Sequence, residues 1–299
     1  MKIPAGIVGA GYMGLNHAAC YDNDPSCDLV AFFEPLPMSA RKFQELYPAT
    51  LQCDTLAELA TYCDAVSICS PTSFHTSQAL ELLDYGCDLL IEKPVSDKLS
   101  DHLKLRDLAQ KRNQIVQVGL VEQFNPVVKY IQKNCKNPDF VSLLRVSPFS
   151  PRGADVSVVH DLTVHDIGIL VSLFDEPPLL CESVQRDMVE FSTGADINAS
   201  FLTFSGEKKA VILTQRCAFS KSRQVTLSKD QKTYAFDLIL QEGSLVSGSG
   251  LQPLEIPLGD ALRDEVASFL KACRESTPPT NSLDFSLKAF SILEKLQQQ

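Results

Sequence analysis

The sequence has little positive charge. Its 299 residues include 27 lysines and arginines against 37 aspartates and glutamates, so the formal net charge is −10. Proteins that bind nucleic acid over a broad surface carry a basic patch or stripe, and this composition excludes that class. An acidic surface can still hold a locally positive pocket, so a small anionic ligand is compatible with the sequence.

The sequence also has no paired cysteine spacing. There are ten cysteines, none of them in a C-x-x-C pair, and several lie in apolar runs, such as Cys69 after Val66-Ser67-Ile68. Structural zinc sites and disulfide frameworks need such pairs. We therefore expect no metal site, and we expect free buried thiols in the reducing environment of the cytoplasm.

Long apolar runs are absent as well. No run approaches the roughly 18 residues of a membrane-spanning helix, and the first residues lack the pattern of a signal peptide. We therefore expect no membrane partner. Hydrophobic residues make up 44% of the chain, which is enough for a core, and the length predicts one large or two ordinary domains.

What is present is a glycine motif at the start of the chain. The apolar run Ile3–Val8 is followed at once by Gly9-Ala10-Gly11-Tyr12-Met13-Gly14. In G-x-G-x-x-G the first glycine allows a tight turn, the second lets a pyrophosphate approach the backbone, and the third lets the helix pack on the strand. The N–H groups at the start of the following helix face the phosphates. The motif predicts a dinucleotide-binding site.

An acidic residue follows at a suitable distance. Glu34 comes directly after the next apolar run, Leu29–Phe33. A carboxylate about 20 residues beyond the glycines can bind the 2′-hydroxyl of the ribose and repel a 2′-phosphate. The sequence therefore favours NAD over NADP.

The first 120 residues alternate strand-like and helix-like segments. Such alternation predicts a parallel, doubly wound sheet, and we expect an α/β Rossmann domain over residues 1–120. A helix is expected to start at Thr55, which forms a capping box with Glu58, and another is expected to stop at Gly86. The strand candidates are Ile3–Val8, Leu29–Phe33, Ala65–Cys69, Asp88–Ile91 and Ile115–Gly119, and two further helix candidates are Thr76–Tyr85 and Ser100–Lys111.

The pattern changes after Gly119 to a succession of strands with short turns. It predicts an α+β domain over residues 121–299 with a large, mostly antiparallel, open-faced sheet, and the C-terminal helix could pack back on the first domain. The strand candidates are Phe140–Val146, Leu179–Val189, Ile197–Phe204, Lys208–Phe219, Arg223–Ser228, Thr233–Gln241 and Ser244–Ser249, and the helix candidates are Asn125–Asn134, His160–Phe174, Asp260–Glu275 and Asp284–Leu296.

The second sheet carries more apolar side chains than one covered face needs. An exposed apolar face of this kind favours a homodimer or homotetramer formed through the sheet. Apolar residues scattered singly over the surface are the ordinary alternative. The residues concerned are Phe201, Phe204, Val211, Leu213, Phe236 and Leu238.

Ligands of doubly wound sheets bind beyond the carboxyl ends of the strands, and three segments fall there. They are Ser70-Pro71-Thr72-Ser73-Phe74-His75, Glu92-Lys93-Pro94 and the stretch from Gly119 to Asn125. A charged Glu-Lys pair at the end of a buried strand is either a solvated strand end or a functional pair, and the residues alone leave both readings open.

The second domain offers a carboxylate beside a histidine. At about 100° per residue, Asp161 and His165 share one face of the expected helix. A carboxylate raises the basicity of a neighbouring imidazole, which suits a general base, although an ordinary hydrogen-bonded pair has the same spacing. His160 lies on another side of the helix, so a two-histidine metal face is not expected.

Taken in order, these motifs resemble those of the Gfo/Idh/MocA oxidoreductases over essentially the whole chain. The elements are the glycine motif with His17, Ser70-Pro71-Thr72 with His75, Glu92-Lys93-Pro94, and Asp161-x-x-x-His165. The resemblance implies a Rossmann domain followed by an open-faced sheet domain, with a nicotinamide cofactor and a sugar-like polyol between them. It implies an enzyme that transfers a hydride between a CH–OH group and NAD or, less favoured here, NADP.

The resemblance also implies roles for individual residues. His165 would take the hydroxyl proton, Lys93 would stabilise the alkoxide, and Asp161 would orient them. The implied substrate residues are Lys93, Phe124, Asn125, Arg152 and His165, with Arg152 a ligand for a diphosphate. The implied cofactor residues are Gly9, Gly11, Tyr12, Met13, Gly14, Glu34, Ser70, Pro71, Thr72, His75, Glu92, Lys93 and Gln123, whereas His17 is expected to pack inside the first helix.

Three stretches are similar to the UDP-N-acetylglucosamine 3-dehydrogenase subgroup, whose members oxidise the sugar 3-hydroxyl ahead of transamination for lipid A. They are Val121–Pro126, Ser150-Pro151-Arg152 and Asp155–Ile167. The chain departs from the pattern at Gln123, where arginine is usual, at Gly168, where aspartate is frequent, and in lacking a glycine-rich stretch before Asp161.

These departures leave the identity of the substrate open and do not affect the expected type of reaction. An inositol or free-sugar dehydrogenase is the alternative within the family. The second alternative is a regulatory protein of the same fold that binds NAD and catalyses no reaction. The presence of Lys93, Asp161 and His165 argues against it, because a sensor needs no proton chemistry.

Overall fold

The chain forms two compact units. The computed structural model describes residues 2–150, 156–190, 192, 194–248 and 250–297. The first unit comprises residues 1–120 and 262–287, and the second comprises residues 121–261 and 288–299. Helix α8 (Ala261–Glu275) therefore lies almost wholly in the first unit, although it follows the second sheet along the chain.

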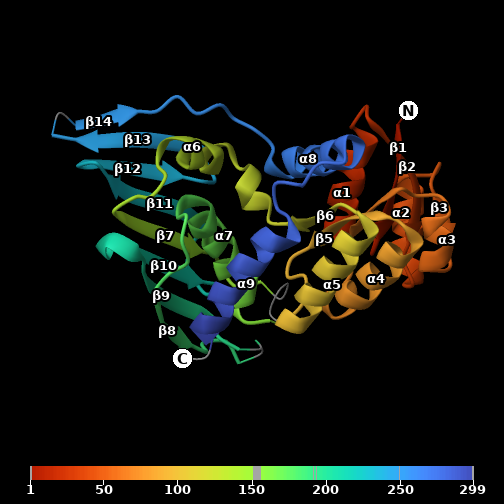
Figure 1. Cartoon of the computed structure of the whole chain (residues 1–299), viewed down its shortest axis with the longest axis horizontal. Coiled ribbons are helices and arrows are strands. Elements are labelled where there is room, and N and C mark those ends of the chain that lie inside the picture. Colours follow the sequence, from red (N-terminus) through yellow and green to blue (C-terminus); the bar gives the residue numbers. More distant parts are fainter. Residues whose placement is uncertain (1, 151–155, 191, 193, 249, 298–299) are drawn as a thin grey trace. The chain divides into compact units, whose positions relative to one another are not determined.

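The first unit is built on a six-stranded parallel sheet (Figure 1). The strand order is β3-β2-β1-β4-β5-β6, so the direction of winding reverses between β1 and β4. This confirms the predicted Rossmann domain. The strands are β1 (Ile3–Val8), β2 (Cys27–Phe33), β3 (Leu51–Cys53), β4 (Ala65–Ile68), β5 (Asp88–Glu92) and β6 (Val116–Gly119).

The helices of the first unit pack on the sheet through apolar side chains. Tyr21, Phe43 and Phe269 are fully buried in one layer that joins α1, α2 and α8 to β1 and β2, while α3, α4 and α5 contact one another in turn. The helices are α1 (Tyr12–Asp22), α2 (Pro37–Leu46), α3 (Leu56–Ala60), α4 (Thr72–Tyr85) and α5 (Leu99–Arg112).

Local sequence signals set several of these boundaries. The Thr55 hydroxyl accepts a hydrogen bond from the N–H of Glu58 at 3.1 Å, which caps α3 as expected. Helix α4 ends at Gly86, whose φ of 96° only glycine adopts readily. Its expected start was wrong, because α4 begins at Thr72, directly after Pro71, and not at Thr76.

The second unit is built on an eight-stranded sheet of order β14-β13-β12-β11-β7-β10-β9-β8. Only β7 and β10 pair in parallel, which confirms the predicted mostly antiparallel sheet. Several strands are shorter than expected, and the sequence did not reveal β3 or β14. The strands are β7 (Phe140–Val146), β8 (Leu180–Arg186), β9 (Ile197–Thr203), β10 (Lys209–Gln215), β11 (Ser222–Lys229), β12 (Lys232–Asp237), β13 (Glu242–Ser247) and β14 (Gly250–Pro253).

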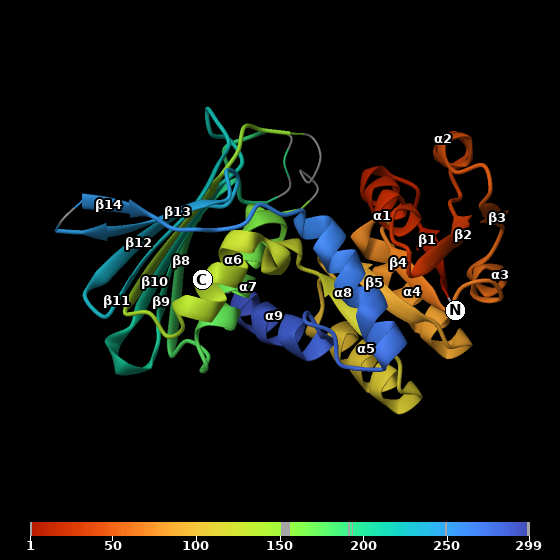
Figure 2. The ribbon, with the colours of Figure 1, turned by 90° about the horizontal axis from the view of Figure 1, so that it is seen from above.

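Helices cover one face of this sheet. Figure 2 shows α6 (Pro126–Asn134), α7 (Val164–Leu173) and the C-terminal part of α9 (Leu283–Gln297) on the same side. Phe204, Phe236 and Leu238 are buried in the core that these helices close. Phe201 and Leu213 point to the opposite face and remain 49% and 37% exposed. In the part of the chain that the structure describes, no helix is long and apolar enough to cross a bilayer.

Candidate functional site

Two of the three glycines of the first loop, Gly9 and Gly14, occupy positions where a side chain would not fit. Gly9 has a φ of 89°, and a Cβ there would lie 2.6 Å from the backbone nitrogen of Ser70. A Cβ on Gly14 would overlap the carbonyl oxygen of Gly9, whereas the space beside Gly11 is open. No side chain among the described residues caps α1 at Gly11. The loop therefore fits a diphosphate, which would take the place of a cap at the positive end of the helix.

Glu34 lies over this loop. Its Oε2 accepts a hydrogen bond from the N–H of Ala10 at 2.7 Å, and its Oε1 accepts one from the N–H of Leu36 at 2.8 Å. The side chain is buried, with 8% of its surface exposed. Each carboxylate oxygen has a second lone pair, so the group can also accept a ribose hydroxyl. This is the position that the sequence predicted for the acidic residue.

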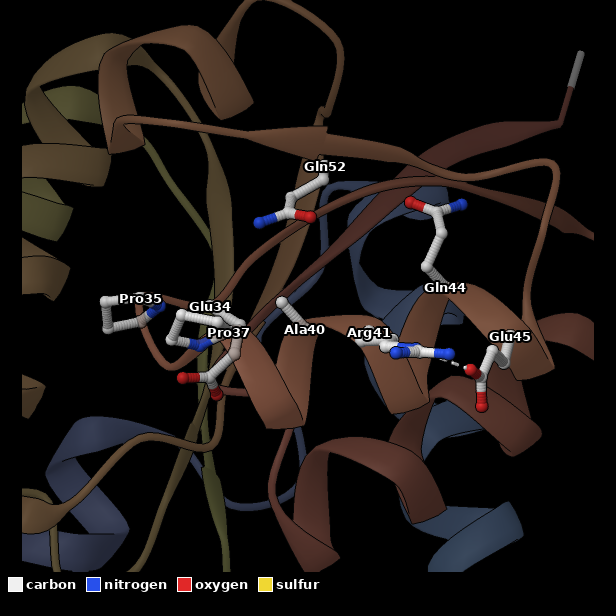
Figure 3. Close-up of a pocket in the computed structure, with 8 residues that line it drawn as sticks. All are labelled: Glu34, Pro35, Pro37, Ala40, Arg41, Gln44, Glu45 and Gln52. Carbon is white, nitrogen blue, oxygen red and sulfur yellow. Dashed lines mark hydrogen bonds and ion pairs between the residues drawn. The ribbon is translucent and has the colours of Figure 1, made fainter.

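A cavity of about 440 Å³ adjoins Glu34 (Figure 3). Arg41 on α2 points towards Glu45 and away from Glu34, and its Nε donates a hydrogen bond to Glu45 at 2.9 Å. Arg41 is the one cationic side chain among the described residues that line this cavity, and it forms an ion pair with Glu45. The cavity is lined by Glu34, Pro35, Pro37, Ala40, Arg41, Gln44, Glu45 and Gln52.

His75 connects the segments that follow β4 and β5. Its Nδ1 lies 2.9 Å from the carbonyl oxygen of Pro94, and its Nε2 lies 2.7 Å from that of Ser70. Burial lowers the pKa of His75, although both carbonyl groups oppose the shift. Thr72, which the sequence placed in a loop, opens helix α4. A neutral ring donates to only one of these two carbonyl oxygens at a time, so His75 links the two segments through a single hydrogen bond. A contact between His75 and the cofactor stays a prediction.

Glu92 is the buried partner of His17. The Nε2 of His17 lies 3.1 Å from Glu92 Oε1, and its Nδ1 lies 3.0 Å from the hydroxyl of Ser67, which also contacts Tyr21 at 2.7 Å. Burial raises the pKa of Glu92, but His17 and Lys93 outweigh it and lower the pKa. The N–H of Lys93 donates to Glu92 Oε2 at 3.1 Å. Glu92 therefore fixes the backbone of Lys93, and His17 packs inside as expected.

The second unit holds the other pair of candidate residues. Asp161 and His165 are half-buried, but the segment Val159–Thr163 is a π-turn and α7 begins only at Val164. The expected continuous α-helix from His160 is therefore wrong in its first turn, and the angle of about 100° per residue does not relate Asp161 to His165. Single π-turns are rare and often mark functional sites.

A buried ion-pair network anchors the residue next to His165. Asp166 accepts hydrogen bonds from Nε and Nη2 of Arg145, at 3.0 and 2.8 Å, and Arg145 Nη1 donates to Glu122 at 2.8 Å. Arg223 Nη1 donates to the same Glu122 oxygen at 2.7 Å. Burial raises the pKa of Glu122, but Arg145 and Arg223 reverse this and lower the pKa. Burial likewise raises the pKa of Asp166, which Arg145 only partly offsets.

The remaining predicted residues belong to the second unit. Gln123 and Phe124 are buried, and Gln123 Oε1 accepts a hydrogen bond from Gln132 at 2.7 Å. Asn125 caps α6 by accepting from the N–H of Val127, and its amide donates to the carbonyl oxygen of Leu238 at 3.0 Å. Arg152 lies outside the described residues. Substrate or cofactor contacts of these four residues stay predictions.

Sequence reasoning missed Arg145, Arg223 and Glu265. The two arginines lie on the same strand faces as buried residues, Arg145 with Val141 on β7 and Arg223 with Val225 on β11. A charged residue on the core-facing side of a strand is the signal that could have found them. Glu265 is fully buried on α8, and no pattern in that amphipathic helix distinguished it.

Comparisons with known proteins agree with this architecture. Residues 3–120 match the Gfo/Idh/MocA family, described as an oxidoreductase family with an NAD-binding Rossmann fold. UDP-N-acetylglucosamine 3-dehydrogenase of Acidithiobacillus ferrooxidans is 25% identical over 91% of this chain and 89% of that protein. Inositol 2-dehydrogenase of Rhizobium meliloti is 24% identical over 78% of this chain and 72% of that protein.

Solved structures share the fold over the whole chain. The Acidithiobacillus ferrooxidans UDP-N-acetylglucosamine 3-dehydrogenase superposes with a TM-score of 0.93 at 22% identity, covering 100% of this chain and 97% of that chain. An oxidoreductase from Agrobacterium radiobacter in complex with NAD+, L-tartaric acid and magnesium gives a TM-score of 0.90 at 11% identity, covering 100% of this chain and 96% of that chain.

Proposed function

Because residues 3–120 are a domain of the Gfo/Idh/MocA oxidoreductase family, we propose that this chain is an NAD-dependent dehydrogenase that oxidises a secondary hydroxyl group of a sugar. The 3-hydroxyl of UDP-N-acetylglucosamine is the favoured target, supported by the relative that matches along nearly the whole chain. The observation that carries the proposal is the glycine loop, sterically restricted to glycine at Gly9 and Gly14, with Glu34 lying over it.

The first unit supplies the residues for the cofactor. The open space beside Gly11 and the uncapped start of α1 would hold the diphosphate, and Glu34 would bind the ribose hydroxyls. Glu34 would also repel a 2′-phosphate, so NAD is favoured over NADP. Ten free thiols suit a reducing compartment such as the cytoplasm.

The proton chemistry is assigned to three side chains. Lys93 stabilises the negative charge that develops on the substrate oxygen, His165 accepts the hydroxyl proton, and Asp161 orients the imidazole. The bound nicotinamide ring supplies the hydride acceptor. Glu92 would fix the backbone of Lys93 and Asp166 that of His165, since each carboxylate is anchored by a basic side chain and is the sequence neighbour of the residue concerned.

The test is NADH formation with UDP-N-acetylglucosamine, followed by absorbance. Lys93→Ala and His165→Ala should each lower kcat by about 10²- to 10⁴-fold. Lys98→Ala, an exposed lysine just beyond Lys93, and His160→Ala, in the π-turn before His165, are matched controls and should retain activity.

Three other outcomes separate the alternatives. Unchanged turnover in both Lys93→Ala and His165→Ala would defeat the assignment of the active site. Turnover of myo-inositol but of no nucleotide sugar would select the inositol dehydrogenase alternative. Binding of NAD without turnover of any sugar would select a regulatory protein.

The uncovered face of the eight-stranded sheet supports self-association. Leu180, Val184, Phe201 and Leu213 are exposed on neighbouring strands of this face, and such a patch marks an interface. We propose that two copies pack through it. Phe201→Glu should shift the intact protein towards monomer in light scattering after gel filtration. A parent protein that is itself monomeric would overturn this arrangement.

A further inference from the structure

Arg223 lies opposite another arginine on the helix-covered face of the second sheet. The register of β11 on β7 pairs Arg223 directly with Arg145. Like charges at directly opposite positions of an antiparallel pair destabilise a sheet. Glu122 lies between them, and the same carboxylate oxygen accepts a hydrogen bond from each guanidinium, at 2.8 Å from Arg145 and 2.7 Å from Arg223.

The two arginines differ in how fully their donors are used. Arg145 directs Nε and Nη2 at Asp166 and Nη1 at Glu122, and its side chain is 3% exposed. Arg223 uses only Nη1 on a described residue, and its side chain is 34% exposed. A guanidinium carries five N–H donors. Arg223 therefore presents a planar edge of unused donors at the accessible end of the network.

Arg223 is the less favourably paired of the two cations in the network, because its contact is to a carboxylate oxygen that Arg145 also uses. Burial and the neighbouring Arg145 lower the pKa of Arg223, and Glu122 and Asp166 do not make up the difference. Glu122 is shared between two cations, and Asp166 is engaged by Arg145. An oxyanion at the exposed edge would stabilise the charged form of Arg223, and a bidentate pair with the planar guanidinium would fix the orientation of that oxyanion.

We propose that Arg223 binds an anionic oxygen group of the substrate, so that the sugar oxidised by this protein carries a phosphate or a carboxylate. The inference rests on the proposed dehydrogenase function, whose favoured substrate carries a diphosphate, and adds the residue that would bind the anionic group. The network ties Arg223 through Glu122 and Arg145 to Asp166, the residue after His165. Arg223 and Asp166, the sequence neighbour of the proposed base, therefore belong to one polar network within the second unit. A neutral polyol would leave the unused donors of Arg223 without a charged partner.

The first experiment compares a charged and an uncharged substrate. Arg223→Gln should raise KM for UDP-N-acetylglucosamine about 10- to 100-fold more than KM for N-acetylglucosamine, as expected for the loss of a hydrogen bond to a charged group. Arg223→Lys should give a smaller increase, because it keeps the charge and loses the fork. Lys229→Gln removes a cation at the far end of the same strand and is the matched control, with KM unchanged for both sugars.

A binding measurement separates this inference from the proposed activity. UDP, inorganic pyrophosphate and glucuronate are added singly, and the midpoint of thermal unfolding is followed, because a ligand stabilises the folded state it binds. Protection by UDP or pyrophosphate that is lost in Arg223→Gln supports a phosphate, and protection by glucuronate lost in the same variant supports a carboxylate. Either result stands even if no sugar is oxidised.

Two results would overturn the proposal. One is equal protection of the parent protein and Arg223→Gln by each anion, or no protection of the parent by any of them. The other is an equal change in KM for charged and uncharged sugars, which would assign Arg223 a purely structural role. Should Arg223→Gln fail to fold, Arg223→Lys replaces it, and an anion affinity equal to that of the parent would then contradict the bidentate contact.

Discussion

Glu265 on α8 is a buried acid without a partner. It has no exposed surface, and neither carboxyl oxygen has a hydrogen-bond partner among the described residues. Only its backbone carbonyl is engaged, by Gln117 Nε2 at 2.9 Å. Burial, reinforced by the charge of Glu92, raises the pKa of Glu265 well above its ordinary value. The folded protein therefore keeps this group protonated to a higher pH than the unfolded chain does.

A raised pKa makes this residue a source of instability that grows with pH. Above the pKa of about 4.3 in the unfolded chain, folding requires Glu265 to take up a proton. The cost is about 1.4 kcal/mol per pH unit until the pH passes the pKa of the folded state. A carboxyl that stays protonated at pH 7 thus costs up to about 3.7 kcal/mol there. The cost vanishes towards pH 4.

Glu265→Gln should remove this cost, because the amide has the shape of the protonated acid and does not titrate. The variant should equal the parent protein in stability near pH 4.5 and exceed it increasingly towards pH 7. Urea unfolding followed by circular dichroism at several pH values measures the difference. Glu275→Gln, at an exposed position of the same helix, is the control and should show no such trend. A stability difference between Glu265→Gln and parent that is constant from pH 4.5 to 7 would refute the reasoning.

Three more substitutions examine separate parts of the molecule. Gly14→Ala should abolish NADH binding in a fluorescence titration, since the new Cβ would overlap the Gly9 carbonyl oxygen; binding as in the parent would contradict the proposed cradle. In the parent protein the Kd for NADP should exceed the Kd for NAD by at least about tenfold. Glu34→Gln should lower this ratio of dissociation constants, because the charge that repels the 2′-phosphate is gone. Asp166→Asn should lower the free energy of unfolding by about 3–5 kcal/mol, because Arg145 would remain buried without a full counter-charge; a change below 1 kcal/mol would count against the network.

The first unit could be predicted from sequence where local sterics decide the structure. The strand Ile3–Val8 has the predicted bounds, and Gly86 ends α4 because a short-range backbone requirement selects glycine there. Strand β3 (Leu51–Cys53) escaped prediction because its first two side chains are exposed and form no apolar run. The early start of α4 was missed because the segment Ser70–His75 was assigned to the region beyond the strand end, although a proline such as Pro71 is compatible with a helix start.

Only those residues of the candidate site that lie in local sequence motifs could be predicted. Glu34 could be located because the spacing from a glycine loop to the end of the next strand is nearly constant. The contacts of Glu92 with His17 and of Arg145 with Asp166 join residues 75 and 21 positions apart, and no local pattern encodes them. The π-turn at Val159–Thr163 depends on packing as well, since Thr163 is held by Thr214 on a neighbouring strand.

The long-range contacts follow the same pattern in each unit: a carboxylate that a basic side chain anchors lies next in sequence to a residue assigned to proton chemistry. Lys93 follows a buried carboxylate that His17 anchors, and His165 precedes a buried carboxylate that Arg145 anchors. In both cases the side chain assigned to proton chemistry remains half-buried, while its sequence neighbour is fixed in the interior. A reacting group can thus stay accessible while its backbone is held rigidly, which is what orientation of a substrate hydroxyl demands. In the proposed mechanism Glu92 and Asp166 would therefore act by positioning Lys93 and His165, and neither would exchange a proton with the substrate.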